Sequence, residues 1–319
     1  MMSNEERNNM NEEMPEVKQS MEVQQGSIKW DKKKFTIYII LSFSVAWVFQ
    51  VIASILGLRG NQMAFNMILS VSMFVPLLSA LIAGVPLKKI GWKPVLKGNI
   101  KYILMAWFGP LVLTVLGAVL YYIIFPDRLD LTGAFLKASY GEIALAQMEA
   151  QGITLPALII ISVIQAATYA PWINMIFALG EEAGWRGVMH PMLKDKLGRT
   201  KGVIVSGVIW GAWHWPVMVI AGYEYGLVYW GAPVLGMALF CLVTVVMGTL
   251  FDVLYEKTKC IWVPALAHGA VNAVCSLPML VLDPAYGDQL TVGPLPIGII
   301  GVLPALALTI WMLCRKENK

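Results

Sequence analysis

Long apolar segments recur along the whole chain and are separated by short polar stretches. Each is about 20 residues long or longer, which is enough for a helix to cross roughly 30 Å of hydrocarbon. The apolar positions are continuous and do not alternate with period two, which disfavours a transmembrane β-barrel. The pattern predicts an all-α fold, a polytopic transmembrane helical bundle with about eight spans. These are expected at residues 36–58, 64–86, 100–125, 154–180, 203–221, 232–254, 261–281 and 294–313.

The start of the chain lacks this pattern. Its first residues are rich in Glu, Asn, Gln, Met and Ser and end in a basic cluster, and such a segment cannot bury enough apolar surface to offset the entropy of ordering it. We therefore expect a disordered polar tail over residues 1–34 and a single membrane domain over residues 35–319. The tail has no basic-then-apolar signal pattern, so the first span is expected to be a retained anchor.

Composition agrees with a membrane protein. The chain is 58% hydrophobic and only 14% charged, with a mean hydropathy of +0.66, whereas soluble proteins carry about 25% charged residues. The net charge of +4 comes from basic residues in short loops, so it does not indicate a nucleic-acid partner. The cysteines show no paired spacing and are read as small buried hydrophobes rather than a disulfide framework or a metal knuckle. They are Cys241, Cys260, Cys275 and Cys314.

The distribution of Lys and Arg predicts the topology. Twenty of the 24 basic residues lie in segments that alternate spans place on one side, and only Arg59, Arg128 and Lys137 lie in the opposite loops. Cytoplasmic loops carry the excess of basic residues. We therefore expect a multi-pass protein of the cell membrane with both termini in the cytoplasm.

Three charged residues stand at the end of the fourth apolar segment, in the sequence GEEAGWRG at residues 180–187. Each costs roughly 2.5–3.5 kcal/mol at mid-bilayer on insertion scales, so the group calls for a reason. Glu182 and Arg186 are four apart and can pair on one helix face. Glu181 is rotated by about 100° from its neighbour and has no evident local partner. Pro171 is expected to kink this long segment.

Two of the three histidines also fall inside predicted spans. His214 lies in the fifth, and His268 lies in the seventh, one helical turn before Asn272. The third, His190, is expected near the membrane interface. Intramembrane ionisable groups tend to face a shared interior cavity, so Glu181, His214, His268 and Asn272 are candidates for one site.

A purely structural interpretation exists for each of these residues. A Glu–Arg pair is often a neutralised structural contact, a lone His in a span often bridges helices, and an intramembrane Asn is commonly interhelical glue. Asp252 is interpreted as a boundary or pairing residue. Taken together, however, the four candidates supply the parts for hydrolysis. A carboxylate can activate water while one His positions it, and a second His with a carboxamide can stabilise an oxyanion.

Three motifs in order, EExxxR (Glu181, Glu182, Arg186), an aromatic residue four before a His (Trp210, His214) and HxxxN (His268, Asn272), resemble the CPBP or Abi family. These are intramembrane endopeptidases related to the type II CAAX prenyl endopeptidases. The resemblance covers about residues 150–280. It implies that Glu181 activates water with His214 as its partner, that His268 and Asn272 form the oxyanion site, and that Glu182 and Arg186 support the motif. Trp210 stands where the family usually has Phe.

The resemblance also implies a protein or peptide substrate, either prenylated or a bacteriocin precursor. Family members are often labelled metalloproteases, and Glu181, His214 and His268 would make a three-ligand zinc set with an open position for water. The chain has no HExxH motif, which is a more specific zinc signal. No metal or other cofactor is therefore expected, with zinc as the alternative.

Three classes of function remain open at the level of sequence. The first is an intramembrane endopeptidase that hydrolyses a peptide bond with Glu-activated water. The second is a non-catalytic membrane protein that confers bacteriocin immunity or acts as a scaffold. The third is a proton-coupled transporter, which would also use buried Glu and His, although the chain shows no internal repeat of the kind that many transporters have.

Overall fold

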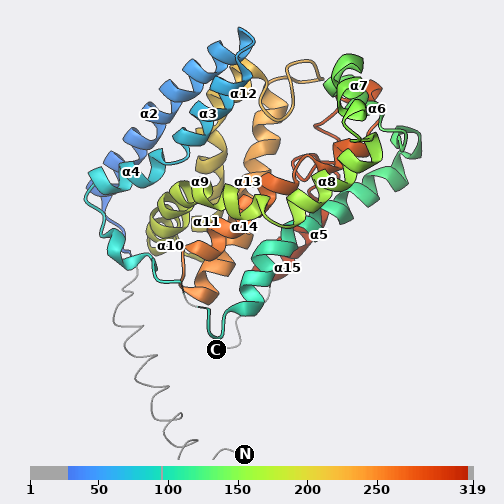
Figure 1. The fold of residues 1–319 in the computed structure, drawn as a ribbon. Coiled ribbons are helices and arrows are strands. Elements are labelled where there is room, and N and C mark those ends of the chain that lie inside the picture. The colour runs from blue at the N-terminus through green and yellow to red at the C-terminus, as the bar shows by residue number, and fades with distance from the viewer. Residues whose placement is uncertain (1–27, 95, 315–319) are drawn as a thin grey trace, which may run out of the picture.

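The structure is a computed structural model that describes residues 28–94 and 96–314, and its described part is helical with no strand (Figure 1). The helices are α2 (Lys32–Leu58), α3 (Gln62–Ser72), α4 (Val75–Ile82), α5 (Ile100–Ile124), α6 (Ala134–Tyr140), α7 (Glu142–Ala150), α8 (Leu155–Ala167), α9 (Ala170–Gly184), α10 (His190–Leu197), α11 (Arg199–Trp213), α12 (Trp215–Ala221), α13 (Val234–Thr258), α14 (Trp262–Val274) and α15 (Leu303–Cys314). Short 3-10 turns η1 (Leu87–Lys89), η2 (Pro126–Arg128), η4 (Leu277–Val281) and η5 (Pro284–Tyr286) lie between them, and a π-helical turn, η3 (Trp185–Met189), joins α9 to α10.

The all-α bundle predicted from the apolar segments is confirmed. Among the described residues, six helical segments are long and apolar enough to cross a membrane, and a seventh is obtained if α7 and α8, bent by 89° from each other, count as one span. The last predicted span, residues 294–313, contains only the 12-residue helix α15. The predicted tail lies outside the described residues up to position 27, and α2 begins at Lys32.

The predicted kink at Pro171 is instead a complete break a few residues earlier. Helix α8 ends at Ala167, and Thr168 leaves helical geometry with φ −112° and ψ −87°. Pro171 then lies in the first turn of α9, where a missing N–H costs nothing. The indole N–H of Trp107 donates to the carbonyl of Ala167 at 3.0 Å. The break is therefore tolerated because a neighbouring helix supplies a donor to the freed backbone carbonyl.

Helix α9 lies at the centre of the bundle, against α14 on one side and α4 on the other. Two glycines make this packing possible. A Cβ at Gly269 of α14 would lie 2.5 Å from backbone atoms of Met175 and Pro171, and a Cβ at Gly184 would overlap Pro76 of α4. Small residues of this kind let membrane helices approach closely. The charged motif is consequently enclosed by protein on both sides.

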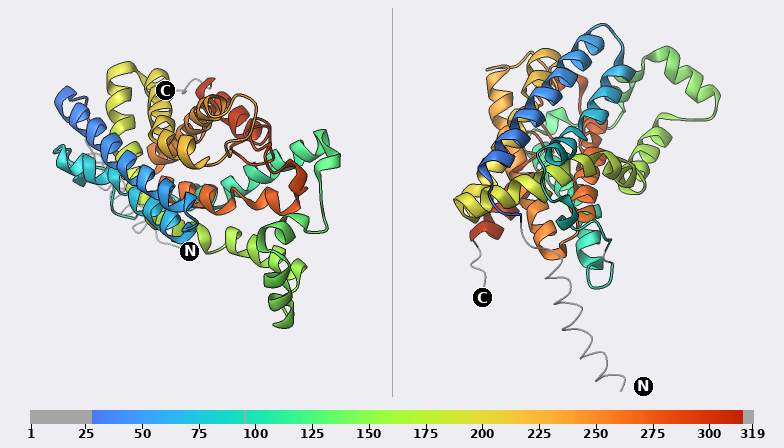
Figure 2. Two further views of the ribbon diagram at one scale, coloured as in Figure 1. Left: turned by 90° about the horizontal axis from the view of Figure 1, so that it is seen from above. Right: turned by 90° about the vertical axis from the view of Figure 1, so that its left-hand side faces the viewer.

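The remaining helices flank this centre. Helix α11 packs along α13, and α2 packs against α3, α4 and α12. Helices α6 to α8 extend from the body of the bundle as an arm, which both views of Figure 2 show. In Figure 1 the start of α2 and the end of α15 lie at one end of the bundle, and the loop between α12 and α13 lies at the other.

Candidate active site

Glu181 is buried, with 2% of its surface exposed, and two tryptophans bind the same oxygen of its carboxylate. The indole N–H of Trp185, one turn along the chain, donates to Oε2 at 2.9 Å. The indole N–H of Trp210, from α11, donates to Oε2 at 2.7 Å. Among the described residues no donor reaches Oε1. The carboxylate is therefore held rigidly through one oxygen, while the other is available to a water or a substrate.

Glu182 binds two different groups, one through each oxygen. Its Oε2 lies 2.7 Å from Nε of Arg186, and both side chains are fully buried. Its Oε1 lies 2.8 Å from Nδ1 of His268, which comes from α14. The pairing of Glu182 with Arg186 was predicted from their spacing, but the contact with His268 was not. Glu182 therefore connects the motif on α9 to a histidine 86 positions away.

The guanidinium of Arg186 lies among aromatic rings. Its centre is 4.3 Å from the ring of Trp210 and 5.1 Å from that of Phe251. None of its N–H groups makes an aligned hydrogen bond within the described residues, so its contact with Glu182 is electrostatic in spite of the short distance. Cation–π contacts are strong when desolvated. They explain how a buried guanidinium is accommodated beside one carboxylate.

The π-helical turn at Trp185–Met189 contains Arg186. A π turn adds a residue to the normal helical repeat and rotates the side chains that follow it, and such turns are frequent at functional sites. A Cβ at Gly187, within this turn, would lie 3.1 Å from Ile90, so this segment also packs closely against its neighbours.

His214 lies at the junction of α11 and α12, just before the Trp215-Pro216 start of α12. Its backbone N–H donates to the carbonyl of Gly211 and not to that of Trp210, four residues before it. The carbonyl of Trp210 is instead bound by Nδ1 of the imidazole at 3.0 Å. This contact places the ring proton on Nδ1 in the neutral form and leaves Nε2 as an acceptor. The ring of Tyr223 lies parallel to the imidazole, at 6.2 Å between centroids.

A buried glutamine of α2 completes this junction. The carboxamide of Gln50 donates to the carbonyl of Trp213 at 2.8 Å and accepts from the N–H of Val217 at 3.3 Å. In an unbroken helix the N–H of Val217 would donate directly to the carbonyl of Trp213. The carboxamide of Gln50 lies between these two groups and binds both. Sequence reasoning missed Gln50, and a polar residue in the first apolar span was the only signal for it.

The fourth candidate, Asn272, and the remaining histidine, His190, lie in different surroundings. Asn272 is exposed, one turn beyond His268 on α14, and makes no hydrogen bond that the described residues account for. His190 was expected near the interface, but it is fully buried. The start of α10 places it 3.5 Å from Asp252, which also binds Lys194 at 2.7 Å. The pairing interpretation of Asp252 is correct, and His190 belongs to this separate cluster.

Trp210 connects the candidate residues. Its indole N–H binds Glu181, its carbonyl binds His214, and its ring stands edge-on to His268 at 5.3 Å between centroids. The sequence predicted that Glu181, His214 and His268 share one site, with His214 as the partner of Glu181. The direct hydrogen bonds of Glu181 go to two tryptophans, and His268 binds Glu182. Trp210 therefore links the predicted site residues to one another.

No three His, Cys, Asp or Glu side chains within the described ranges are grouped so that they could hold a metal ion. The hydrogen bonds among the described residues involve Oε2 of Glu181 and Nδ1 of each site histidine, and none of them involves Oε1 of Glu181 or either Nε2. Histidines that bind a metal commonly have their other ring nitrogen on a carbonyl or a carboxylate in this way. Glu181, His214 and His268 therefore stay the set to test for zinc.

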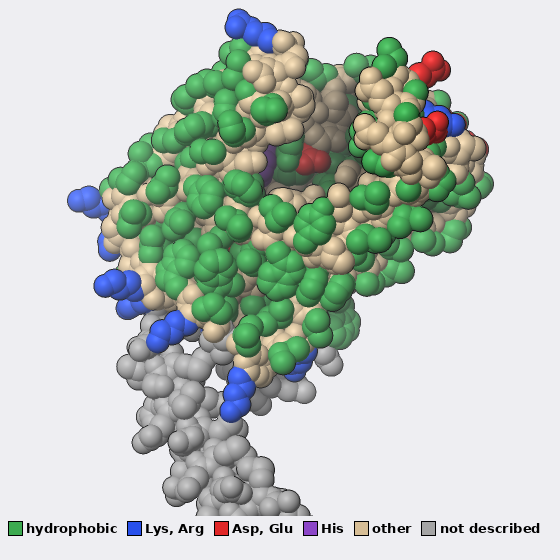
Figure 3. All heavy atoms as spheres, viewed as in Figure 1, with side chains coloured by type: hydrophobic (Ala, Val, Ile, Leu, Met, Phe, Trp, Pro, Cys, Tyr) green, Lys and Arg blue, Asp and Glu red, His purple; other side chains and the backbone are tan. Residues whose placement is uncertain are grey.

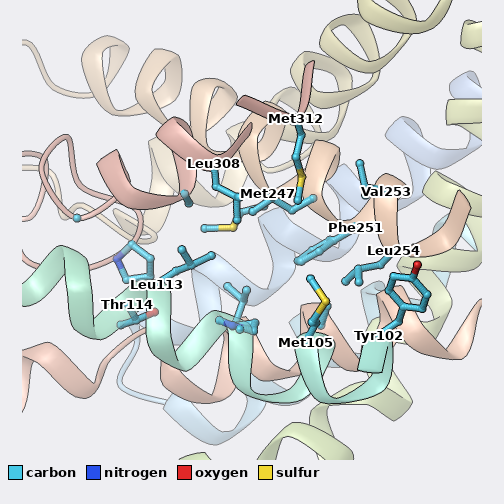
Figure 4. Close-up of a pocket in the computed structure, with 18 residues that line it drawn as sticks. Tyr102, Met105, Leu113, Thr114, Met247, Phe251, Val253, Leu254, Leu308 and Met312 are labelled. Atoms are coloured by element: carbon cyan, nitrogen blue, oxygen red, sulfur yellow. The ribbon is translucent and has the colours of Figure 1, made fainter. Parts of the chain in front are cut away.

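Figure 3 shows a hollow between the body of the bundle and the α6–α7 arm, with acidic and histidine side chains visible inside it. A second cavity, of about 150 Å³, lies among α5, α13, α14 and α15 (Figure 4). Its walls are almost entirely apolar, and Phe251 is one of them. The ring of Phe251 stacks on His268 at 5.7 Å between centroids. The apolar cavity therefore lies directly behind the candidate site.

Residues 149–274 match the family described as type II CAAX prenyl endopeptidase, Rce1-like. The matched range includes Glu181, Glu182, His214, His268 and Asn272, and it agrees with the resemblance carried by the motifs. No curated protein matches the chain significantly.

Proposed function

On the premise that residues 149–274 match the type II CAAX prenyl endopeptidases, we propose that the chain is an intramembrane endopeptidase that hydrolyses a peptide bond with water activated by Glu181. One observation carries the proposal: a buried carboxylate is fixed through Oε2 by two indole N–H groups, and its Oε1 is unoccupied by protein donors. A general base needs this combination of fixed position and one free oxygen.

In the first step, Oε1 of Glu181 accepts a proton from a water molecule. The oxygen of that water attacks the carbonyl carbon of the scissile bond, and the electron pair of the C=O bond moves to its oxygen. His214 assists because its Nδ1–H is committed to the carbonyl of Trp210. Its Nε2 can then accept a hydrogen bond from the same water and hold it in line.

The second step stabilises the oxyanion formed by this attack. The carboxylate of Glu182 contacts Nδ1 of His268. A carboxylate in this position orients the ring and stabilises the imidazolium. Nε2–H of His268 can then donate to the oxyanion. Asn272, one turn further along α14, is the second donor, and its exposed side chain is free to turn toward a bound substrate. Preorganised donors of this kind are often the largest contribution to catalysis.

In the last step the oxyanion collapses and the C–N bond breaks. The departing nitrogen takes the proton that Glu181 had accepted, so that one product is a carboxylic acid and the other an amine. Glu181 returns to its carboxylate form. No covalent intermediate is needed, in keeping with the absence from the sequence of a Ser or Cys with an evident base beside it.

The substrate is a membrane-associated protein or peptide. The apolar cavity behind Phe251 supports a lipid-modified substrate, because its walls offer an alkyl chain contact without unpaired polar groups. Its position directly behind His268 would place such a chain next to the reacting bond. A prenylated peptide is therefore one substrate class to test, alongside unmodified peptides.

The test compares membranes that contain the wild-type protein with membranes that contain Glu181→Gln. New protein N-termini are identified by mass spectrometry, and a farnesylated reporter peptide is assayed in the same membranes. We expect a set of N-termini that depends on Glu181 and falls by about 10²–10⁴-fold in the variant, which is the range for loss of a general base. Exposed Glu149→Gln is the matched control and should leave cleavage unchanged.

Two outcomes decide against the proposal. Identical N-termini in wild-type and Glu181→Gln membranes would favour the non-catalytic alternative. Cleavage that is lost with a strong chelator and restored by zinc would overturn the metal-independent mechanism while keeping the endopeptidase.

A further inference from the structure

Glu224 is an acidic residue near the site that the proposed mechanism does not use. It lies in the loop between α12 and α13, directly after Tyr223, whose ring is parallel to His214. The carboxylates of Glu224 and Glu181 both lie within electrostatic range of Tyr223. Glu224 is therefore the direct neighbour of a residue whose ring lies against the candidate site.

The backbone holds Glu224 in an unfavourable conformation. Its φ is +69°, and Lys259 is the only other non-glycine residue with a positive φ in the described ranges. Such geometry is unfavourable and persists only where neighbouring contacts enforce it. The next residue supplies one of them, because the hydroxyl of Tyr225 donates to the carbonyl of Ile297 at 2.7 Å. The backbone at Glu224 is thus held in a strained conformation by the loop around it.

The carboxylate has no cationic partner. Within the part of the chain that the structure describes, no Lys, Arg or His lies within ion-pair distance of Glu224. Burial raises the pKa of Glu224 above its ordinary value. The same carboxylate raises the pKa of Tyr223 well above its ordinary value. A positive group brought next to Glu224 would relieve both effects, and the attraction is stronger here than in bulk water.

The surrounding end of the bundle is acidic as well. The segments that connect the spans at this end, the arm of α6 and α7 included, carry seven acidic residues and three basic ones, a net charge of −4. The Lys and Arg side chains of Figure 3 gather mainly at the opposite end and along the left edge. A field of this sign attracts cations and repels anions during approach. The acidic residues of these segments are Asp127, Asp130, Glu142, Glu149, Glu224, Asp283 and Asp288.

We propose that Glu224 is a specificity-determining residue that binds a positively charged group of the substrate, either a Lys or Arg side chain or a free N-terminal amine. The inference rests on the proposed endopeptidase function and names its substrate class: a cationic, membrane-associated peptide that enters from the end of the bundle that carries the loop between α12 and α13.

The test uses internally quenched peptides that carry a C-terminal hexadecyl amide and are incorporated in phosphatidylcholine vesicles with the purified full-length protein. Each position in turn is Lys, norleucine or Glu, and a parallel set has an acetylated N-terminus. We expect a preference of tenfold or more for Lys over norleucine at one position, or for the free over the acetylated amine. The preference should appear mainly in KM, because Glu224 binds substrate and performs no chemistry.

Three variants separate binding from folding. Glu224→Gln should lose the preference, and Glu224→Lys should prefer Glu at the same position. Glu224→Gly relieves the positive φ, so it should fold at least as well as the wild type and still lose the preference. Glu142→Gln, on the exposed arm, removes an equal charge and should retain it.

The outcomes for this inference and for the proposed function are distinct. Cleavage that requires Glu181 but is indifferent to Lys, or a Lys preference that survives Glu224→Gln, overturns the role of Glu224 and leaves the endopeptidase intact. If none of the peptides is cleaved in a Glu181-dependent way, both proposals fall.

Discussion

The indole N–H of Trp210 donates a 2.7 Å hydrogen bond to Oε2 of Glu181. Trp185 donates to the same oxygen at 2.9 Å, so the proposed base has two equivalent supports. Phe, which is usual at position 210 in the family that the motifs resemble, would keep the ring but remove its donor. The second indole therefore provides a redundancy that a Phe-containing site would lack at this position.

The first prediction follows from this redundancy. Trp210→Phe and Trp185→Phe should each lower kcat by only about threefold or less, because one donor remains, whereas the double variant should lose about 10²-fold, well beyond the product of the two single losses. A hydrogen bond to a charged group is worth roughly 1.5–3 kcal/mol, and each 1.4 kcal/mol corresponds to about tenfold in rate. The measurement is a double-mutant cycle on kcat with a Glu181-dependent substrate.

An additive result would show that the two donors act separately and would contradict the redundancy. A comparison of Trp210→Phe with Trp210→Leu separates the loss of the N–H donor from the loss of the aromatic ring. Leu removes the contacts with Arg186 and His268, and it should lower the unfolding temperature as well as kcat.

The second prediction separates the two contacts of Glu182. Glu182→Gln leaves the buried Arg186 without its counter-charge, so it should lower the free energy of unfolding by roughly 3–5 kcal/mol. The double variant Glu182→Gln/Arg186→Met removes both charges and should recover most of that stability. Its activity should stay low, because a neutral carboxamide beside Nδ1 of His268 no longer stabilises the imidazolium. Thermal unfolding in detergent and cleavage rate are measured on the same preparations.

Wild-type activity in the double variant would show that Glu182 serves only to neutralise Arg186. Conversely, a double variant as unstable as the single one would show that the carboxylate stabilises the fold through His268.

Sequence reasoning succeeded where the determinants were local. The apolar segments follow from their length alone, and the Glu182–Arg186 contact follows from a spacing of one helical turn. It failed to assign the long-range partners of two adjacent carboxylates. Residues 181 and 182 differ by about 100° around a helix, and which of them faces α14 depends on how closely α9 and α14 approach at Gly269.

The same limit explains the errors for His190 and for the last span. His190 lies four residues beyond Arg186 and was expected near the interface, but α10 turns its first residue inward toward Asp252. In the last span, residues 294–302 are apolar yet lie in turns, because hydropathy records burial and not helix formation. Gln50 is a further case, since only the break at His214 gives its carboxamide two backbone partners.

The third prediction concerns this carboxamide. Gln50→Leu leaves the N–H of Val217 without its acceptor, which should lower the free energy of unfolding by about 1–3 kcal/mol. Because Gln50 fixes the junction that carries His214, kcat should fall more than the change in stability explains. Ser44→Leu, on an exposed position of the same helix, is the control and should change neither. Full activity in Gln50→Leu would show that the junction is held by Trp47, which also donates to Trp213.

The fourth prediction tests whether the apolar cavity holds the lipid part of a substrate. Gly109 lines this cavity (Figure 4), and a Cβ there would meet no atom within 4 Å. Gly109→Phe should therefore fill the cavity without displacing the backbone. Cleavage of a farnesylated peptide should fall by tenfold or more, while the same peptide without the farnesyl group should be cleaved as before. Val112→Phe, on the exposed side of α5, adds the same ring outside the cavity and should leave both rates unchanged. An equal loss for the two peptides in Gly109→Phe would mean that the ring disturbs His268 through Phe251, and equal retention would show that the lipid binds elsewhere.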